Sequence, residues 1–207
     1  LGAFLADKEI LLVLDNCEHL LAAAPLLTEL LAGAPQLRIL ATSRQRLNLA
    51  AKSLEPVASL PTPSPDASLA DLMDNPAAQL FTARARRVLP SFELTADNAA
   101  AVGRICRLAG GLPLAVELAA HWVTAFTPAE IAAAIERQIG FLVTPYVDVP
   151  ERQRSLLAVI ERSWRLLSPE EQRALAALSL FQHRFDRQTA QAVAACDLAV
   201  LHSLTNR

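Results

Sequence analysis

The feature that most constrains the fold is an apolar run, Ile10–Leu14, which stops abruptly at Asp15. Five consecutive apolar residues ending at a charged one are typical of a strand buried on both faces of a parallel sheet. A second strand is predicted at Leu37–Thr42, where apolar residues predominate. Between the runs, residues 18–32 have helical character, and Pro25 either kinks that helix or starts a second segment. Strand, helix and strand joined by short connections predict a βαβ unit and hence a parallel sheet.

Two proline-rich breaks divide the rest of the chain. Alternating prolines over residues 60–66 favour an extended connector, and a third short strand is expected just before it, near Leu54–Val57. Beyond the connector the sequence is almost wholly helical, with a second break at residues 143–150. We therefore expect three parts, residues 1–60, 61–150 and 151–207.

Start and stop signals place several of the helices. The pairs Asn75-Pro76, Thr127-Pro128 and Ser168-Pro169 each put a capping residue before a proline at the first helical position. Ser168 with Glu171 also fits a capping box. Gly110-Gly111 ends one helix and Leu112-Pro113 opens the next, an arrangement that also fits a plain helix–turn–helix joint.

Composition excludes several classes of protein. With 19 basic and 21 acidic residues, the net charge of −2 gives no electrostatic indication of nucleic-acid binding. Three cysteines without a CxxC spacing predict neither a disulfide framework nor a zinc site, which favours a reducing, cytoplasmic location. No apolar run approaches the roughly 18 residues of a membrane span. Because the chain starts at Leu1 and shows no leader, we expect an internal piece of a cytoplasmic protein.

Polar residues follow both predicted strands, at the sheet edge where ligands bind in open parallel sheets. Asp15 offers a hard oxygen ligand that suits Mg²⁺ beside phosphates. Glu18, on the same loop, is a candidate for orienting an attacking water. The second strand delivers Thr42, Ser43 and Arg44, whose hydroxyls and planar guanidinium suit a γ-phosphate.

Each signal also has a purely structural interpretation. An acid after an apolar strand can simply cap the next helix, although the pair of strand ends is more specific than Asp15 alone. The basic stretch Arg84–Arg87 fits a solvated helix face, and Trp164 fits the core side of an amphipathic helix. A serine hydrolase is not favoured, because the Gly-x-Ser-x-Gly elbow is missing and Ser43 lies beside an arginine rather than a base.

Taken together, these residues resemble the NB-ARC-like STAND ATPases, closest to the branch found in bacterial LuxR-type and antibiotic-regulatory transcriptional regulators. Three motifs carry the resemblance over roughly residues 1–125, and a fourth stretch resembles the following domain of that family. They are Leu11-Leu12-Val13-Leu14-Asp15-Asn16-Cys17-Glu18-His19-Leu20, Arg38-Ile39-Leu40-Ala41-Thr42-Ser43-Arg44, Gly111-Leu112-Pro113-Leu114-Ala115, and Ser163-Trp164-Arg165-Leu166-Leu167-Ser168-Pro169-Glu170-Glu171-Gln172.

The resemblance implies a fold of α/β type followed by an all-α part. Residues 1–60 would be the C-terminal part of a P-loop NTPase sheet, residues 61–150 a helical lid, and residues 151–207 an incomplete winged helix. The phosphate-binding Walker A loop is expected to precede Leu1. Little nucleotide affinity is therefore expected from this chain alone.

The resemblance also implies roles for individual residues. Asp15 would be the Walker B acid that holds Mg²⁺ through water, and Glu18 would position a water. Thr42, Ser43 and Arg44 would form the sensor that reads the γ-phosphate. The Gly111-Leu112-Pro113 turn would bring Pro113 against the adenine of ADP or ATP.

In that family ADP keeps the lid closed, and exchange for ATP opens it and permits self-association. The implied partners are nucleotide, Mg²⁺ and other domains of the same protein, with DNA bound only through domains outside this chain. Asn16 stands where many relatives carry a second acid, so hydrolysis would be slow or replaced by exchange. The alternative function is a helical adaptor or DNA-binding regulatory segment with no nucleotide role.

Overall fold

The computed structural model describes residues 2–19, 23–47, 49, 53–144, 154–181 and 185–205. The chain divides into two units. One unit comprises Leu1–Glu55 together with Leu167–Arg207, and the other comprises Pro56–Leu166. Among the described helices, none is long and apolar enough to cross a lipid bilayer.

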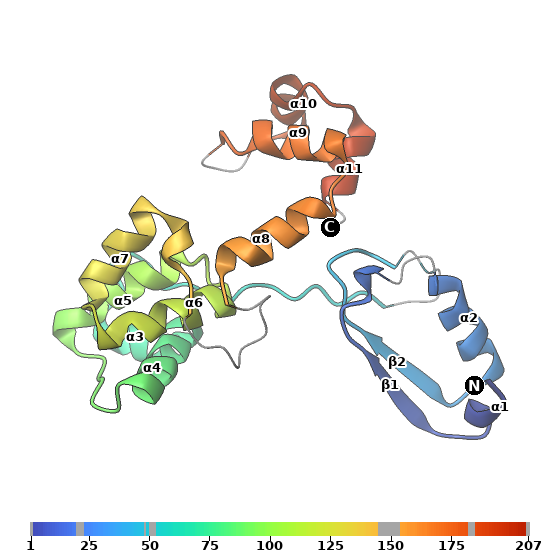
Figure 1. Ribbon diagram of the computed structural model, residues 1–207, viewed down its shortest axis with the longest axis horizontal. Coiled ribbons are helices and arrows are strands. Elements are labelled where there is room, and N and C mark those ends of the chain that lie inside the picture. The colour runs from blue at the N-terminus through green and yellow to red at the C-terminus, as the bar shows by residue number, and fades with distance from the viewer. Residues whose placement is uncertain are drawn as a thin grey trace. The chain divides into compact units, whose positions relative to one another are not determined.

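The N-terminal segment forms a βαβ unit (Figure 1). Its strands β1 (Ile10–Leu14) and β2 (Leu37–Ala41) pair in parallel, from Ile10 opposite Leu37 to Leu14 opposite Ala41. This pairing confirms the two predicted strands and their direction. The elements between and before them are α1 (Gly2–Leu5), the 3-10 turn η1 (Cys17–His19) and α2 (Ala24–Gly33). Pro25 lies in the first turn of α2, so it starts a helix rather than kinking one.

One face of this sheet packs on the helices and the other does not. Leu37 is buried in a small core with Leu5 of α1 and Leu30 of α2. On the opposite face Leu11 and Val13 are 60% and 58% exposed. The expectation that β1 is buried on both faces is therefore wrong for the residues that the structure describes. The reason is that α1 and α2 both supply apolar side chains to the same face.

The third strand expected near Leu54–Val57 is not observed. Residues 53–60 form neither a strand nor a helix. Val57 is 97% exposed. Pro56 lacks the N–H that a ladder needs, and neither β1 nor β2 pairs with this segment.

Helices make up most of the Pro56–Leu166 unit. They are α3 (Leu69–Asp74), α4 (Pro76–Val88), α5 (Ala96–Leu108), α6 (Pro113–Ala120), the 3-10 turns η3 (His121–Thr124) and η4 (Ile139–Phe141), α7 (Pro128–Arg137) and α8 (Leu156–Arg165). Their first turns follow the predicted caps. Asn75 accepts from the N–H groups of Ala77 and Ala78 at 3.0 and 3.2 Å. Thr127 and Glu130 form a capping box at the start of α7.

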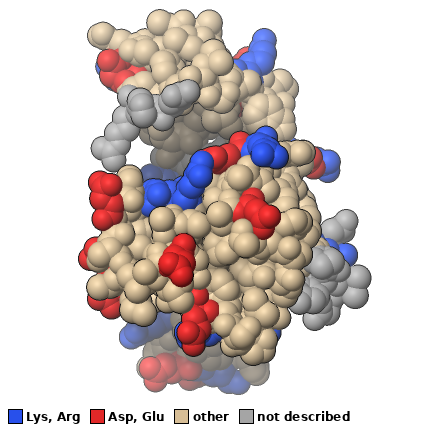
Figure 2. Space-filling model, turned by 90° about the vertical axis from the view of Figure 1, so that its left-hand side faces the viewer, with Lys and Arg blue, Asp and Glu red and all other residues tan. Residues whose placement is uncertain are grey.

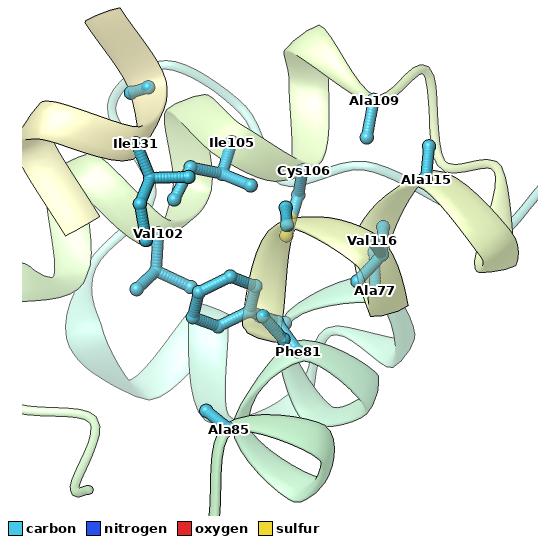
Figure 3. Close-up of a cluster of buried hydrophobic side chains, with 14 of the residues drawn as sticks. Ala77, Phe81, Ala85, Val102, Ile105, Cys106, Ala109, Ala115, Val116 and Ile131 are labelled. Atoms are coloured by element: carbon cyan, nitrogen blue, oxygen red, sulfur yellow. The ribbon is translucent and has the colours of Figure 1, made fainter. Parts of the chain in front are cut away.

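Phe81 on α4 lies at the centre of the helical core (Figure 3). Its ring is fully buried and meets Phe92 edge-on, with the ring centroids 5.9 Å apart. Side chains from α5, α6 and α7 close around it, among them Val102, Val116 and Ile131. Burying so much apolar surface from four helices stabilises this unit independently of the small sheet.

The last helices are α9 (Pro169–Leu178), α10 (Arg187–Ala194) and α11 (Leu198–Thr205), with α9 packed against both of the others. Glu171 is 4% exposed and accepts a hydrogen bond from the Ser168 N–H at 2.7 Å, which confirms the predicted capping box. The Ser203 hydroxyl donates to the same carboxylate at 2.5 Å. Trp164 near the end of α8 is 37% exposed, so its predicted core position is wrong.

Candidate functional site

Asp15 and Thr42 meet because the strands that precede them are in register. Leu14 pairs with Ala41, which places the next residue of each strand at the same sheet edge. There the Thr42 hydroxyl donates a hydrogen bond to the Asp15 carboxylate. The Thr42 N–H continues the ladder to the Leu14 carbonyl at 2.9 Å. The carboxylate is thereby held at the sheet edge that parallel α/β proteins use for ligands.

Asn16 turns the chain away from the sheet immediately after this acid. Its φ of +62° lies in the left-handed region, which Asn adopts more readily than most residues. Its N–H donates to the Thr42 hydroxyl oxygen at 3.0 Å. The Cys17 N–H donates to the Thr42 carbonyl at 2.9 Å. Thr42 therefore fixes both the acid and the turn that follows it.

Glu18 and Arg44 form the second contact between the two strand ends. The Arg44 Nε lies 3.6 Å from Glu18 Oε1. The Glu18 side chain is only 3% exposed, whereas that of Arg44 is 38% exposed. A carboxylate removed from water in this way needs a compensating charge, which the guanidinium supplies. Glu18 is thus part of an ion pair, a relation that its sequence position did not indicate.

The neighbouring residues have local roles. The exposed Ser43 hydroxyl accepts from the Gln45 N–H at 3.2 Å, as in a short polar turn. Cys17 is 2% exposed, as expected of a small buried hydrophobe. Burial raises the pKa of its thiol, and the charges of Glu18 and Asp15 raise it further. Both effects disfavour the thiolate, which is the reactive form of a cysteine.

The oxygen donors at this edge suit a hard cation that keeps part of its water shell. Among the described residues, no cluster of three or more His, Cys, Asp or Glu side chains could enclose a metal ion. A single carboxylate beside a hydroxyl, Asp15 with Thr42, is instead the kind of donor set that Mg²⁺ uses together with substrate phosphates. The residues present therefore fit Mg²⁺ with a phosphate ligand better than a zinc or calcium cage.

The glycine turn lies in the other unit, where it joins α5 to α6. Gly110 and Gly111 have φ values of +60° and +66°. A Cβ on Gly111 would stand 2.0 Å from the Leu60 carbonyl oxygen, and the Leu60 N–H donates to the Gly111 carbonyl at 2.9 Å. The close contact between Gly111 and Leu60 therefore holds the proline-rich connector, residues 60–66, against the helices. The sequence alone did not reveal this role.

Pro113 is the first residue of α6, and Leu112 before it is 48% exposed. This geometry confirms the predicted helix–turn–helix joint at this point. The structure thus gathers Asp15, Glu18, Thr42, Ser43 and Arg44 in one segment and places Gly111, Leu112 and Pro113 in the Pro56–Leu166 unit.

Four arginines of the helical unit are engaged in contacts within the protein. In Figure 2 the basic and acidic side chains that face the viewer are interspersed. The engaged guanidinium groups are those of Arg84 with Glu117 at 2.8 Å, Arg86 with the Phe92 carbonyl at 3.2 Å, Arg104 with Glu136 at 2.5 Å, and Arg107 with the Ser64 carbonyl at 3.0 Å. Arginines used in this way are poor candidates for a continuous phosphate-binding stripe.

Comparison with known proteins finds similarity to mycobacterial proteins that are named as HTH-type transcriptional regulators. It is 41% identical over 196 residues to "Putative HTH-type transcriptional regulator Rv0890c" of Mycobacterium tuberculosis, a match that covers 94% of this chain and 21% of that protein. The counterpart from Mycobacterium bovis, "Putative HTH-type transcriptional regulator Mb0914c", gives the same values.

A shorter relative, "Uncharacterized protein Rv0894" of Mycobacterium tuberculosis, is 39% identical over 192 residues, covering 92% of this chain and 46% of that protein. The chain therefore spans between about a fifth and a half of the length of these relatives. No family model matches the chain, and no solved structure matches it.

Proposed function

We propose that this chain is a nucleotide-responsive segment of a transcriptional regulator. The observation that carries the proposal is the meeting of Asp15 with Thr42, and of Glu18 with Arg44, at the ends of two parallel strands. Similarity over nearly the whole chain to proteins named as transcriptional regulators supports the regulatory part.

In this proposal Asp15 is the residue that holds Mg²⁺, which when bound would neutralise phosphate charge. The Thr42 hydroxyl keeps the carboxylate at the sheet edge, so little reorganisation is needed on binding. Arg44 supplies a guanidinium whose planar fork matches phosphate oxygens. It is partly exposed and can therefore reach a ligand that approaches from solvent.

The remaining roles come from the resemblance to STAND ATPases. They are adenine contact by the Gly111-Leu112-Pro113 turn, a phosphate loop upstream of Leu1, a switch between ADP and ATP states, and nucleotide-dependent self-association. Slow ATP hydrolysis by the longer protein is compatible with this proposal, because Asn16 offers no second carboxylate beside Asp15.

A second candidate is a helical adaptor or DNA-binding regulatory segment without a nucleotide role. The names of the relatives favour it, because they carry the term HTH-type. The internal contacts of Arg84, Arg104 and Arg107 weigh against DNA binding by the Pro56–Leu166 unit. If the chain is a DNA-binding segment, its affinity for DNA should fall steeply with salt.

The test is a titration of fluorescent ADP and ATP, with and without Mg²⁺, into this chain and into the protein extended upstream of Leu1. We expect binding by the extended protein, and an Asp15→Ala variant should lose its Mg²⁺-dependent part. Asp7→Ala, at an exposed acid remote from the strand ends, is the matched control. An extended protein that ignores nucleotide at millimolar concentration but shifts DNA in a salt-sensitive manner would favour the second candidate.

A further inference from the structure

The Thr42 hydroxyl has no proton left for a ligand. A hydroxyl group carries one proton to donate and two lone pairs that accept. Because a carboxylate can only accept, the contact between Thr42 and Asp15 Oδ1 uses that proton. The Asn16 N–H, whose nitrogen lies 3.0 Å from Thr42 Oγ1, uses one of the lone pairs. A phosphate oxygen also needs a donor, so it could bind Thr42 only by breaking the hydrogen bond to Asp15.

The hydroxyl of the next residue, Ser43, is engaged differently. Its oxygen accepts from the Gln45 N–H at 3.2 Å, and it donates to no residue that the structure describes. Ser43 is exposed and lies just beyond the end of β2. It therefore keeps a proton that an approaching anion can accept.

The Thr42 hydrogen bond also determines which oxygen of Asp15 is available to a cation. It occupies Oδ1, whereas no described residue donates to Oδ2. Oδ2 is thus the oxygen that can meet a cation or a water bound to one, on a carboxylate whose orientation Thr42 holds. Partners that orient a metal-binding side chain in this way typically change metal affinity by about ten- to hundredfold.

We propose that the two adjacent hydroxyls have different roles, in which Ser43 donates to a phosphate oxygen and Thr42 is a positioning residue that acts through Asp15 and its cation. This inference deepens the proposed nucleotide function and rests on it. The resemblance to STAND ATPases implies one shared role for both residues, contact with the γ-phosphate. Under the division proposed here, Thr42 affects nucleotide binding only when Mg²⁺ is present, and Ser43 affects it with or without Mg²⁺.

The test compares Thr42→Val with Ser43→Ala in the protein extended upstream of Leu1. ATP dissociation constants are measured by equilibrium titration with Mg²⁺ and with EDTA, and the ratio of the two constants is the Mg²⁺ enhancement. Thr42→Val should lower this enhancement about tenfold and weaken binding only with Mg²⁺. Ser43→Ala should weaken ATP binding about tenfold under both conditions and leave the enhancement constant.

Further variants separate positioning by Thr42 from a loss of folding. Thr42→Ser retains the hydroxyl and should restore the Mg²⁺ enhancement. In an Asp15→Asn background, Thr42→Val should bring no additional loss, because Thr42 acts only through Asp15. If Thr42→Val does not fold, Thr42→Cys replaces it, since a thiol is a much weaker donor. Thr124→Val and Ser91→Ala, at exposed positions of the Pro56–Leu166 unit, are the matched controls and should change neither constant.

The outcomes distinguish this inference from the proposed function. If the wild-type extended protein binds no ATP, the nucleotide function and the division of roles are both contradicted. If it binds ATP but Thr42→Val leaves the Mg²⁺ enhancement unchanged, Thr42 does not act through Asp15, and only the division of roles is contradicted. A Ser43→Ala protein that binds ATP as tightly as the wild type contradicts the role of Ser43 in the same way.

Discussion

The Thr42 hydroxyl donates to the Asp15 carboxylate and accepts from the Asn16 N–H, so one side chain joins the ends of both strands. Because Leu14 and Ala41 are direct partners, the parallel register places Asp15 and Thr42 next to each other at the same sheet edge. The sheet edge is thus fixed before any ligand is present, and Thr42 contributes to stability as well as to the proposed site.

Replacing Thr42 by Val should destabilise the βαβ segment by about 1 kcal/mol, the usual net value of a hydrogen bond. Val keeps the shape of Thr but leaves the Asn16 N–H without this acceptor. Thr42→Ser keeps the hydroxyl and should retain most of the stability. Urea unfolding followed by circular dichroism measures the difference. Equal midpoints for the Val and Ser variants would show that these hydrogen bonds do not stabilise the segment.

Gly110 and Gly111 give a matched pair of substitutions. Both have positive φ, so Ala at either position should cost about 1–2 kcal/mol in backbone strain. At Gly111 the new Cβ also collides with the Leu60 carbonyl oxygen, whereas at Gly110 nothing lies within 4 Å. Gly111→Ala should therefore lower the melting temperature distinctly more than Gly110→Ala. Equal losses would mean that the connector is not held against this turn.

The buried thiol of Cys106 should make the free energy of unfolding depend on pH. Burial raises the pKa of its thiol from 9.0 to about 12, so the folded state keeps a proton that the unfolded state releases above pH 9. The stabilisation is complete below pH 9 and is lost as the pH rises toward 12, by about 1.4 kcal/mol per pH unit.

Urea unfolding at several values between pH 8 and pH 11 tests this dependence. Other groups titrate in the same range, so the comparison is with Cys106→Ala, which should have a shallower decline. Parallel declines in the two proteins would contradict the effect of burial. Wild-type Cys106, fully buried, should also resist thiol reagents until the protein unfolds.

Among the polar residues of the C-terminal helices, Glu171 should be the one whose substitution lowers stability most. Its carboxylate caps α9 and accepts from Ser203 on α11, so Glu171→Ala removes both contacts. We expect a loss of about 2 kcal/mol, against about 1 kcal/mol for Ser203→Ala. The exposed neighbour Glu170 provides the control, and Glu170→Ala should change stability little. Thermal unfolding compares the three, and similar losses at positions 170 and 171 would contradict the contact.

The sequence predicted well those features of the fold that depend on residues close together in the chain. The helix starts after Asn75 and Thr127 depend only on a capping side chain and the proline that follows, and both are observed. The strands were recognisable because apolar stretches, interrupted in β2 by Arg38, end in polar residues. The turn at Gly110-Gly111 was likewise predictable, because few other residues adopt a positive φ.

Predictions that depend on distant partners were less successful. The exposed face of β1 and the exposed Trp164 depend on which other elements cover them, and periodicity does not reveal that. The pairing of Glu18 with Arg44 depends on strand register and on the turn at Asn16. For the same reason the sequence indicated a cation site at Asp15 but not the hydroxyl that holds its carboxylate.

The most direct test of the proposed site is paramagnetic broadening by Mn²⁺, a substitute for Mg²⁺, in the extended protein with ADP. Amide NMR signals of Asn16 and Thr42 should broaden far more than those of Ile10 and Leu37, which lie about 16 Å away at the opposite ends of the strands. Asp15→Ala should abolish that pattern. Uniform broadening, or a pattern that survives the substitution, would contradict a cation site at the strand ends.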